Sequence, residues 1–333
     1  MKRKWQILSL LCIVLGLTSC RHSNGFRSDE GMVWNTTYHI VYQSPVDMGD
    51  SIRSVFRDVD RSLSVFNDSS LVSRINRNGT DVPDNMLKDV FEESKRINVL
   101  SYGAFDPTVG PLVDLWGFGR NRDSVRTVSP EVIDSILCSV GIADCRITPE
   151  GKLEKKHPGT LFNFSAIAKG YGCDKVGDML ASNDIDCYMV EIGGEIVVKG
   201  HNRQNTDWHV MIDAPVESSD SVIHERMAVI AVTDCGIATS GNYRNYKEVD
   251  GKRVGHTINP FTGVPANSEI LSVTVVAPRC MTADALATAC MVMSLDSAKA
   301  MIERIPDVGA LFVTAGDDGA WRLVRTSRFP EME

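Results

Sequence analysis

The chain has 333 residues, of which 43% are hydrophobic, and its formal net charge at pH 7 is −8. This composition supplies enough apolar residues for one large core or two smaller ones. The acidic balance, without a basic stripe to offset phosphate repulsion, argues against nucleic acid as a partner. A phosphate-bearing ligand would therefore need a cation or local hydrogen-bond donors.

Residues 1–19 are predicted to be a signal peptide. Lysine and arginine at positions 2–4 precede an apolar run at 7–17, which is too short to span a bilayer as a mature helix. The run ends in Leu-Thr-Ser-Cys, which resembles a bacterial lipobox and predicts that Cys20 is the lipid-modified first residue of the mature protein. The alternative is an ordinary signal peptide with a chance cysteine at this position.

The cysteines of the mature chain do not form a recognisable disulfide framework. Apart from Cys20, they are odd in number and include no Cys-x-x-Cys pair. Most lie in apolar surroundings, where a free cysteine is usually a small core residue. A structural zinc site is therefore not expected.

Residues 20–30 are polar and lack periodicity, which predicts a tether, and residues 31–333 are predicted to form the folded domain. A strand is expected over 33–42 because apolar and polar residues alternate there. Apolar residues at helical spacing then predict a helix-rich first half. The predicted helices cover residues 48–63, 88–102, 130–138 and 169–182.

The second half is richer in β-branched residues, in short segments separated by Gly, Asn, Asp and Pro. A helix over 282–305, capped by Thr282, and a hairpin over 309–324 with Asp318-Gly319 at its turn are expected to close the chain. Helices early and strands late, without regular βαβ alternation, favour an α+β fold with largely antiparallel sheets and flanking helices. The predicted strands cover residues 188–198, 208–212, 227–233, 236–239 and 270–276.

Asp284 and Thr288 lie four residues apart in the last predicted helix. This spacing puts the carboxylate and the hydroxyl on one helical face, where both are available to a hard cation. The alternative is a solvated or self-bonding pair, which is the commoner role of these two residue types in a helix.

Three other stretches carry candidate chemistry. The Gly- and Pro-rich segment 103–119 predicts a fixed loop whose main chain can approach a ligand, or else a tight buried connection. Lys169, near a helix start, could face phosphate oxygens, although a solvated lysine is the usual case and the segment is not a P-loop. His256, before an Asn-Pro turn, could act as acid, base or phosphate donor, although most single histidines do none of these.

Six motifs, in this order along the chain, resemble the ApbE family, the FAD:protein FMN transferases. Together they extend from about Val33 to the end, and six in register do not arise by chance. The resemblance implies a T-fold-like α+β domain. The motifs are Gly-Ala-Phe-Asp-Pro-Thr-Val-Gly-Pro-Leu (103–112), Ile-Ala-Lys-Gly-Tyr (167–171), Glu-Ile-Gly-Gly-Glu (191–195), Ala-Thr-Ser-Gly-Asn-Tyr (238–243), His-Thr-Ile-Asn-Pro-Phe-Thr-Gly (256–263) and Ala-Asp-Ala-Leu-Ala-Thr-Ala (283–289).

The resemblance also implies a reaction. Such enzymes use Mg²⁺ to split the pyrophosphate of FAD, release AMP and place FMN on a Thr or Ser of an acceptor protein as a phosphoester. The implied acceptor is a membrane redox subunit, and the implied location is a lipid anchor in a bacterial membrane, facing the periplasm.

The family's functional positions carry over to this sequence by motif. His256, at the pyrophosphate, and Asp284 would serve catalysis. Asp284 and Thr288 would hold the metal, with main-chain oxygens of Ala166 and Ala287. Beside His256, the implied flavin-nucleotide contacts are Trp34, Phe66, Ala104, Phe105, Asp106, Asn163, Lys169 and Ile258.

The chain departs from the family pattern at three places, none of which is a presumed metal ligand. Trp34-Asn35-Thr36 stands where Met-Gly-Thr is typical, and Asn163 and Asn259 each replace an Asp. Two other functions fit the same residues, namely a Mg²⁺-dependent FAD pyrophosphatase and a non-enzymatic periplasmic lipoprotein that binds FAD. A dinucleotide-binding oxidoreductase is disfavoured because no Gly-x-Gly-x-x-Gly opens a βαβ unit.

Overall fold

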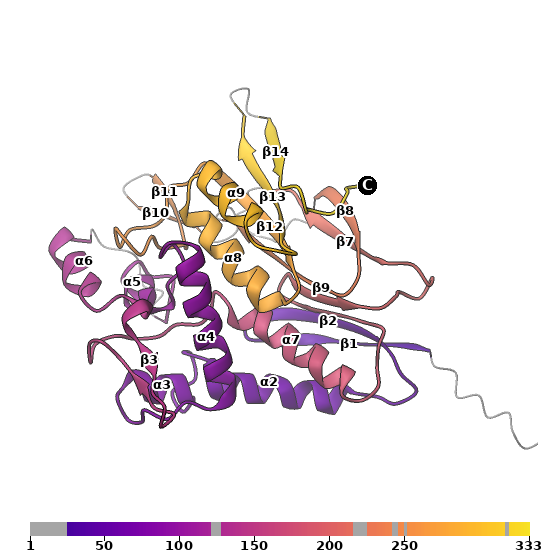
Figure 1. Ribbon diagram of the computed structural model, residues 1–333, viewed down its shortest axis with the longest axis horizontal. Helices are drawn as coiled ribbons and strands as arrows, with labels where there is room; N and C mark the ends of the chain where they lie inside the picture. The colour runs from indigo at the N-terminus through magenta and orange to yellow at the C-terminus, as the bar shows by residue number, and fades with distance from the viewer. Residues whose placement is uncertain (1–24, 121–127, 216–224, 242–245, 250–251, 317–319) are drawn as a thin grey trace, which may run out of the picture.

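A computed structural model describes residues 25–120, 128–215, 225–241, 246–249, 252–316 and 320–333. Its centre is one eight-stranded sheet in the order β1-β2-β5-β6-β9-β12-β13-β14, in which every neighbouring pair is antiparallel (Figure 1). The strands of this sheet are β1 (Phe26–Val33), β2 (Thr36–Gln43), β5 (Tyr188–Ile192), β6 (Glu195–Lys199), β9 (Cys235–Gly241), β12 (Ile270–Ala277), β13 (Gly309–Ala315) and β14 (Trp321–Arg325).

Within the described residues, three two-stranded ladders lie outside this sheet. They pair β3 (Arg146–Ile147) with β4 (Leu153–Glu154), β7 (Trp208–Asp213) with β8 (Arg226–Val232), and β10 (Tyr246–Val249) with β11 (Lys252–Gly255). The helices are α2 (Gly49–Leu63), α3 (Leu71–Asn76), α4 (Asn85–Leu100), α5 (Gly110–Leu115), α6 (Pro130–Leu137), α7 (Ala168–Ala181), α8 (Cys280–Val292) and α9 (Leu295–Glu303), with short 3₁₀ turns at Pro107–Val109 and Ile142–Asp144.

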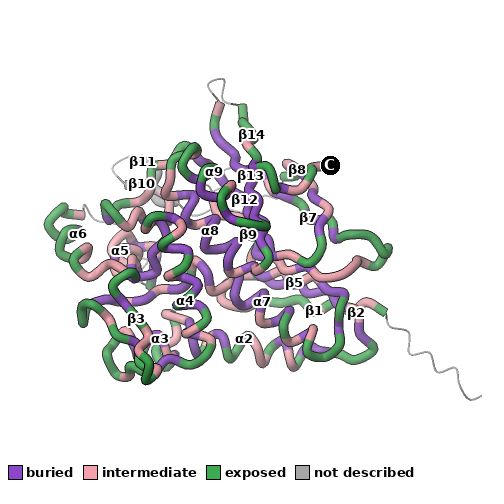
Figure 2. Tube along the Cα trace, in the orientation of Figure 1, coloured by how far each residue is buried: buried purple, intermediate pink, exposed green. Residues whose placement is uncertain are grey.

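Helices α7 and α8 lie against one another and against strands β5, β6, β9 and β12 of the large sheet (Figure 1). Helix α8 is apolar on nearly every side, as expected of a helix enclosed by other elements, and most of its residues are buried (Figure 2). Helices α2 and α4 pack outside this pair, α2 against α7 and α4 against α8. The β7–β8 hairpin joins a separate apolar cluster that includes side chains from β2, β6, β9 and β12.

The α7–α8 pair is held together at both helix starts by aspartates from the partner helix. Asp174 of α7 accepts hydrogen bonds from the backbone N–H groups of Cys280 (2.9 Å) and Met281 (3.0 Å) at the start of α8. In return, Asp284 of α8 accepts one from the N–H of Gly170 at the start of α7 (3.0 Å). Each carboxylate satisfies amides that have no partner within their own helix. The two helices are thereby fixed in register.

The predicted fold class is confirmed, since helices flank a large antiparallel sheet. The predicted tether over 20–30 is wrong for residues 26–30, which belong to β1 and pair in register with β2. Polar residues are tolerated there because this strand lies at the edge of the sheet with much of its surface exposed. Residues 1–24, including Cys20, lie outside the described part of the chain.

Three predicted elements are interrupted by turns. The strand expected over 33–42 begins three residues later, at Thr36, because Val33 ends β1 and Trp34 (φ 47°) and Asn35 (φ 61°) form the turn between β1 and β2. The strand expected over 188–198 breaks at Gly193-Gly194, both with positive φ. The helix expected over 282–305 breaks at Met293, whose extended backbone ends α8, and Ser294, whose side chain caps α9.

The expectation that Thr282 caps the last helix is wrong. Helix α8 begins at Cys280, and its first amides bind Asp174, while the Thr282 hydroxyl donates to the carboxylate of Glu93 on α4. The Gly- and Pro-rich stretch is only partly a loop, since Gly110–Leu115 forms α5. The turn predicted at Asp318-Gly319 lies outside the described residues. No helix in the described ranges is long and apolar enough to cross a membrane.

Candidate active site

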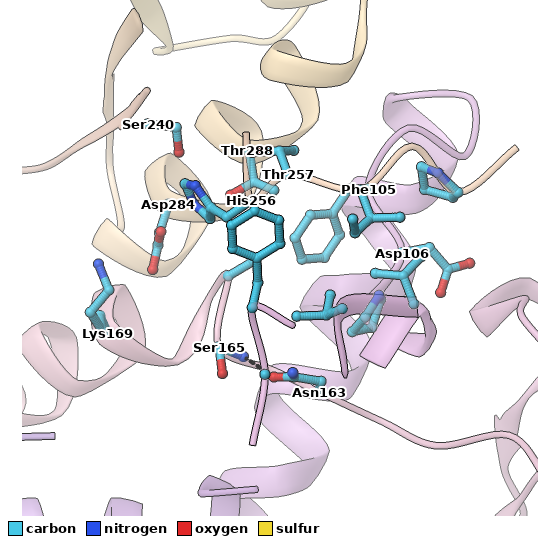
Figure 3. Close-up of a pocket in the computed structure, with 18 of the residues that line it drawn as sticks. Phe105, Asp106, Asn163, Ser165, Lys169, Ser240, His256, Thr257, Asp284 and Thr288 are labelled. Carbon is cyan, nitrogen blue, oxygen red and sulfur yellow. Dashed lines mark hydrogen bonds between the residues drawn. The ribbon is translucent and has the colours of Figure 1, made fainter. Parts of the chain in front are cut away.

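A cavity of about 390 Å³ lies where the α7–α8 pair meets the loops that carry the sequence motifs (Figure 3). Its wall draws on segments far apart in the chain, from Phe66 to Thr288. The structure brings most of the predicted site residues together around it. Those lining it are Phe66, Ala104, Phe105, Asp106, Asn163, Ala166, Lys169, His256, Ile258, Asp284 and Thr288.

A second cavity of about 380 Å³ adjoins the first, since Phe66, Ser165 and Lys169 line both. Trp34, predicted as a flavin contact, lies in this second cavity and not in the first. Its ring packs edge-on against Phe56, with the ring centres 5.5 Å apart. Ala287, predicted to offer a main-chain oxygen to the metal, lines neither cavity and is buried in the core.

The acidic corner of the first cavity depends on close contact between α7 and α8. A Cβ atom on Gly170 would lie 2.5 Å from the carbonyl oxygen of Cys280 and 2.9 Å from Cβ of Asp284. Only glycine therefore lets the two backbones approach this closely. The same approach brings the Gly170 N–H to the Asp284 carboxylate and leaves the residue before it, Lys169, beside that carboxylate.

Lys169 forms an ion pair with Glu195, the first residue of β6, whose side chain is only 4% exposed. Burial lowers the pKa of Lys169, but the charges of Glu195 and Asp284 outweigh it and raise that pKa above its usual value. Burial raises the pKa of both Asp284 and Glu195, and the charge of Lys169 opposes this. The three groups form one electrostatic unit in which two carboxylates share one ammonium.

This corner suits a hard divalent cation. Asp284 offers a carboxylate, Thr288 a hydroxyl and Ala166 a main-chain oxygen, and all three residues line the cavity. Within the described ranges, no group of three or more His, Cys, Asp or Glu side chains converges to hold a metal by itself. Mg²⁺ commonly binds proteins through one or two carboxylates together with substrate phosphates. A cation here would also offset the carboxylate charge that Lys169 leaves uncompensated.

The opposite end of the cavity is largely apolar and contains Phe105, which is 2% exposed, and Ile258, which is 4% exposed. Asp106 lines this end, but its carboxylate oxygens already accept hydrogen bonds from Thr108 and Ile142. The side-chain oxygen of Asn163 likewise accepts the Ser165 N–H at 3.0 Å (Figure 3). These polar groups shape the loops, so the Asp106 carboxylate is already engaged by its own surroundings.

His256 follows β11 and lines the same cavity. Its ring packs edge-on against Phe118, with the ring centres 6.4 Å apart. Figure 3 shows His256 toward the side of the cavity that carries Asp284 and Thr288, away from Asp106. An imidazole in this place can act on a group that reaches the acidic corner.

Sequence reasoning missed Glu195 as a site residue, together with Thr239 and Ser240 of β9, which also line the cavity. All three belong to motifs already singled out, yet no individual residue in them was given a role. A charged residue directly after a Gly-Gly turn and at the start of an apolar strand is a signal that could have identified Glu195. The end of the motif at 238–243 lies outside the described residues.

The ApbE family model matches residues 34–312. This chain belongs to the ApbE family. A FAD:protein FMN transferase of Vibrio cholerae is 38% identical over 327 residues, which cover 95% of each chain. A FAD:protein FMN transferase of Haemophilus influenzae is 34% identical over 318 residues, 91% of each chain.

Solved structures of the ApbE family share the fold. Flavin transferase ApbE from Vibrio cholerae aligns with a TM-score of 0.81 and 35% identity, covering 92% of this chain and 98% of that one. The apo form of flavinyl transferase ApbE from Pseudomonas stutzeri aligns with a TM-score of 0.80 and 28% identity, covering 92% and 96%. The family and the ApbE-like fold predicted from the motifs are therefore confirmed.

Proposed function

We propose that this chain transfers FMN from FAD to a Thr or Ser hydroxyl of an acceptor protein, with Mg²⁺ as cofactor and AMP as the released product. Flavin transfer as the class of reaction is supported by the relatives, which are named as FAD:protein FMN transferases over nearly the full length of this chain. The single observation that carries the proposal is the convergence of Asp284, Thr288, Lys169 and His256 on one cavity.

The shape of the site supports a long dinucleotide substrate. Two adjoining cavities meet at Phe66, Ser165 and Lys169, so a ligand can extend from one into the other. Aromatic side chains stand in both, with Trp34 in the second and Phe105 in the first, and such rings stack well on flat heterocycles. The ammonium of Lys169 at the junction is the natural partner for the pyrophosphate between the two ends of FAD.

Asp284, Thr288 and the main chain at Ala166 would hold Mg²⁺ beside this junction. Bound there, the cation supplies charge neutralisation to the pyrophosphate during phosphoryl transfer. The ammonium of Lys169, paired with Glu195, orients the phosphate oxygens. The acceptor hydroxyl attacks the FMN-side phosphorus in line, a new P–O bond forms, and the P–O bond to AMP breaks. His256 orients the phosphates or takes the proton of the attacking hydroxyl, a role that Asp284 could share.

The test incubates the purified protein with FAD, Mg²⁺ and a candidate acceptor, then measures AMP and in-gel flavin fluorescence after denaturation. Fluorescence on the acceptor, with AMP released in equal amount, is the expected result. AMP and free FMN in equal amounts, with no labelled acceptor, would identify a pyrophosphatase instead. Tight FAD binding without AMP release after Mg²⁺ addition would identify a flavin-storage protein.

We also propose that Cys20 carries a lipid anchor and that the protein faces the periplasm from a bacterial membrane. The lipobox-like Leu-Thr-Ser-Cys sequence supports this. Strand β1 begins at Phe26, so only a short segment separates the anchor from the edge of the sheet. Membrane fractionation of the parent and of Cys20→Ala is the test. Equal membrane retention of the two proteins would argue against the anchor.

A further inference from the structure

The ammonium of Lys169 has two carboxylates within its electrostatic reach. It forms an ion pair with Glu195, and its charge also acts on Asp284. The side chain of Asp284 is the central proposed ligand of the metal. An ammonium that bound Asp284 directly would occupy the same carboxylate as the cation, so the direction in which Lys169 points decides whether that carboxylate is available.

The backbone keeps Lys169 close to Asp284 whatever its side chain does. The next residue, Gly170, donates its N–H to Oδ2 of Asp284 at 3.0 Å, and the contact between α7 and α8 leaves no room for a Cβ atom there. The backbone of Lys169 therefore cannot withdraw from the acidic corner. What can change is the orientation of its long, flexible side chain.

Glu195, by contrast, is held firmly. It lies at the start of β6, directly opposite Ile192 of β5 in the sheet register. Its carbonyl oxygen accepts a hydrogen bond from the thiol of Cys173 at 3.2 Å, and the residue is 3% exposed. A buried carboxylate on a fixed strand end is a suitable anchor for a mobile ammonium, since both charges need a partner when they leave water.

We propose that Glu195 is a positioning residue that holds the ammonium of Lys169 away from Asp284. In this arrangement the Asp284 carboxylate stays free for Mg²⁺, while the ammonium remains at the junction of the two cavities, where phosphate oxygens would lie. The inference rests on the proposed Mg²⁺ site. It assigns a separate function to a residue that is not one of the proposed metal ligands.

The physical reason is competition for one carboxylate. Without the negative charge at Glu195, Asp284 is the buried carboxylate that still attracts Lys169, and attraction between buried opposite charges is strong at low dielectric. Mg²⁺ would then have to displace the ammonium before binding. Residues that hold ligand groups in place around metals typically contribute 10–100-fold to metal affinity. A loss of about that size is expected when Glu195 becomes neutral.

The experiment is a double-mutant cycle read by calorimetric titration of Mg²⁺ into the protein without FAD. Glu195→Gln, which keeps the side-chain size, should raise the Mg²⁺ dissociation constant about 10–100-fold. Lys169→Met in the parent background should change it much less. Combined with Glu195→Gln, Lys169→Met should restore most of the lost affinity, because the competing ammonium is gone. Thermal melts establish that each variant is folded.

Glu191→Gln is the matched control. Glu191 lies on the same β5–β6 hairpin and its carboxylate accepts the Gly194 N–H at 2.7 Å, but it lines neither cavity. The Mg²⁺ affinity of the Glu191→Gln variant should match that of the parent.

Three outcomes would count against the inference, and they can be told apart. If the fold-changes in the Mg²⁺ dissociation constant caused by Glu195→Gln and Lys169→Met simply multiply in the double mutant, the two residues do not act through each other. Glu195 then acts only through its net charge, and the positioning role is overturned. The positioning role is equally overturned if Glu195→Gln binds Mg²⁺ as the parent does. If the parent itself binds no Mg²⁺, the proposed metal site fails and this inference fails with it. If the parent binds Mg²⁺, Asp284→Asn does not, and the effects of the Glu195 and Lys169 substitutions are independent, only the positioning role fails and the proposed function stands.

Discussion

Two buried aspartates stand at opposite ends of one cavity, and their surroundings give them different roles. Asp106 is 9% exposed, and its carboxylate accepts hydrogen bonds from the Thr108 N–H (2.8 Å), the Thr108 hydroxyl (2.5 Å) and the Ile142 N–H (3.0 Å). Asp284 is 4% exposed, accepts the Gly170 N–H and faces the charge of Lys169. Burial raises the pKa of both carboxyl groups.

Burial and location in a cavity therefore do not by themselves identify a reactive carboxylate. The hydrogen bonds to Asp106 come from neutral groups of its own loop and of the 3₁₀ turn at Ile142–Asp144, so this carboxylate fixes loop shape. Asp284 stands among charged groups and beside the hydroxyl-bearing Thr288. These surroundings suit the cation site proposed for Asp284. Substitution of Asp284 should therefore lower activity and Mg²⁺ affinity, whereas substitution of Asp106 should lower stability.

The largest effect is expected from Asp284→Asn. The amide oxygen can still accept the Gly170 N–H, so the fold should persist, but the ligand charge is lost. We expect AMP release and flavin transfer to fall by at least about a hundredfold and Mg²⁺ affinity to fall with them. Steady-state AMP release and calorimetric Mg²⁺ titration provide the measurements.

Asp296→Asn is a control for that substitution, because Asp296 is exposed in the first turn of α9 and lines neither cavity. It should leave both measurements unchanged. An Asp284→Asn protein with near-parental turnover at limiting Mg²⁺ would show that the cation is held elsewhere, and the contrast with Asp106 would disappear.

Asp106→Ala should affect folding more than chemistry. It leaves the Thr108 and Ile142 N–H groups without their acceptor in a buried loop, and each such loss costs about 1–3 kcal/mol. We expect the free energy of unfolding to fall by about 3 kcal/mol, measured by urea denaturation. Mg²⁺ affinity of the folded variant should stay close to the parent's. A variant as stable as the parent would mean that these hydrogen bonds do not hold the loop.

The sequence predicted features that depend on neighbouring residues better than features that depend on contacts between distant segments. The structure brings Asp284, Thr288, Lys169 and His256, which the family motifs singled out, together around one cavity. The β1–β2 turn was missed because Trp34-Asn35 lacks the glycine that usually marks a two-residue hairpin. This turn is determined by the pairing of β1 with β2 along their length and not by the two turn residues themselves.

Contacts between distant segments explain most of the remaining errors. Thr282 has the side chain of a helix cap, but the amides of α8 are bound by Asp174, more than a hundred residues earlier in the chain. Glu195 becomes a site residue only because β6 brings it to Lys169.

The smallest effect is expected at Asp174, a third buried aspartate. Burial raises its pKa to about 6, and the charge of Arg279 and the two amides of α8 oppose this shift. The folded state thus holds the proton more tightly than the unfolded state, whose carboxyl has an ordinary pKa of about 3.9. The contribution of Asp174 to stability is therefore fully present below pH 4 and declines as the pH rises through 6.

Asp174→Asn removes this titration. Its free energy of unfolding relative to the parent should rise by about 2 kcal/mol between pH 4 and pH 7, even if the amide is a poorer cap at every pH. Urea denaturation of both proteins at several pH values measures the difference, and the pH dependence that other carboxyl groups contribute to both proteins cancels in it. A flat difference would mean that Asp174 titrates with its ordinary pKa. The start of α8 and Arg279 would then stabilise the charged carboxylate by as much as burial destabilises it.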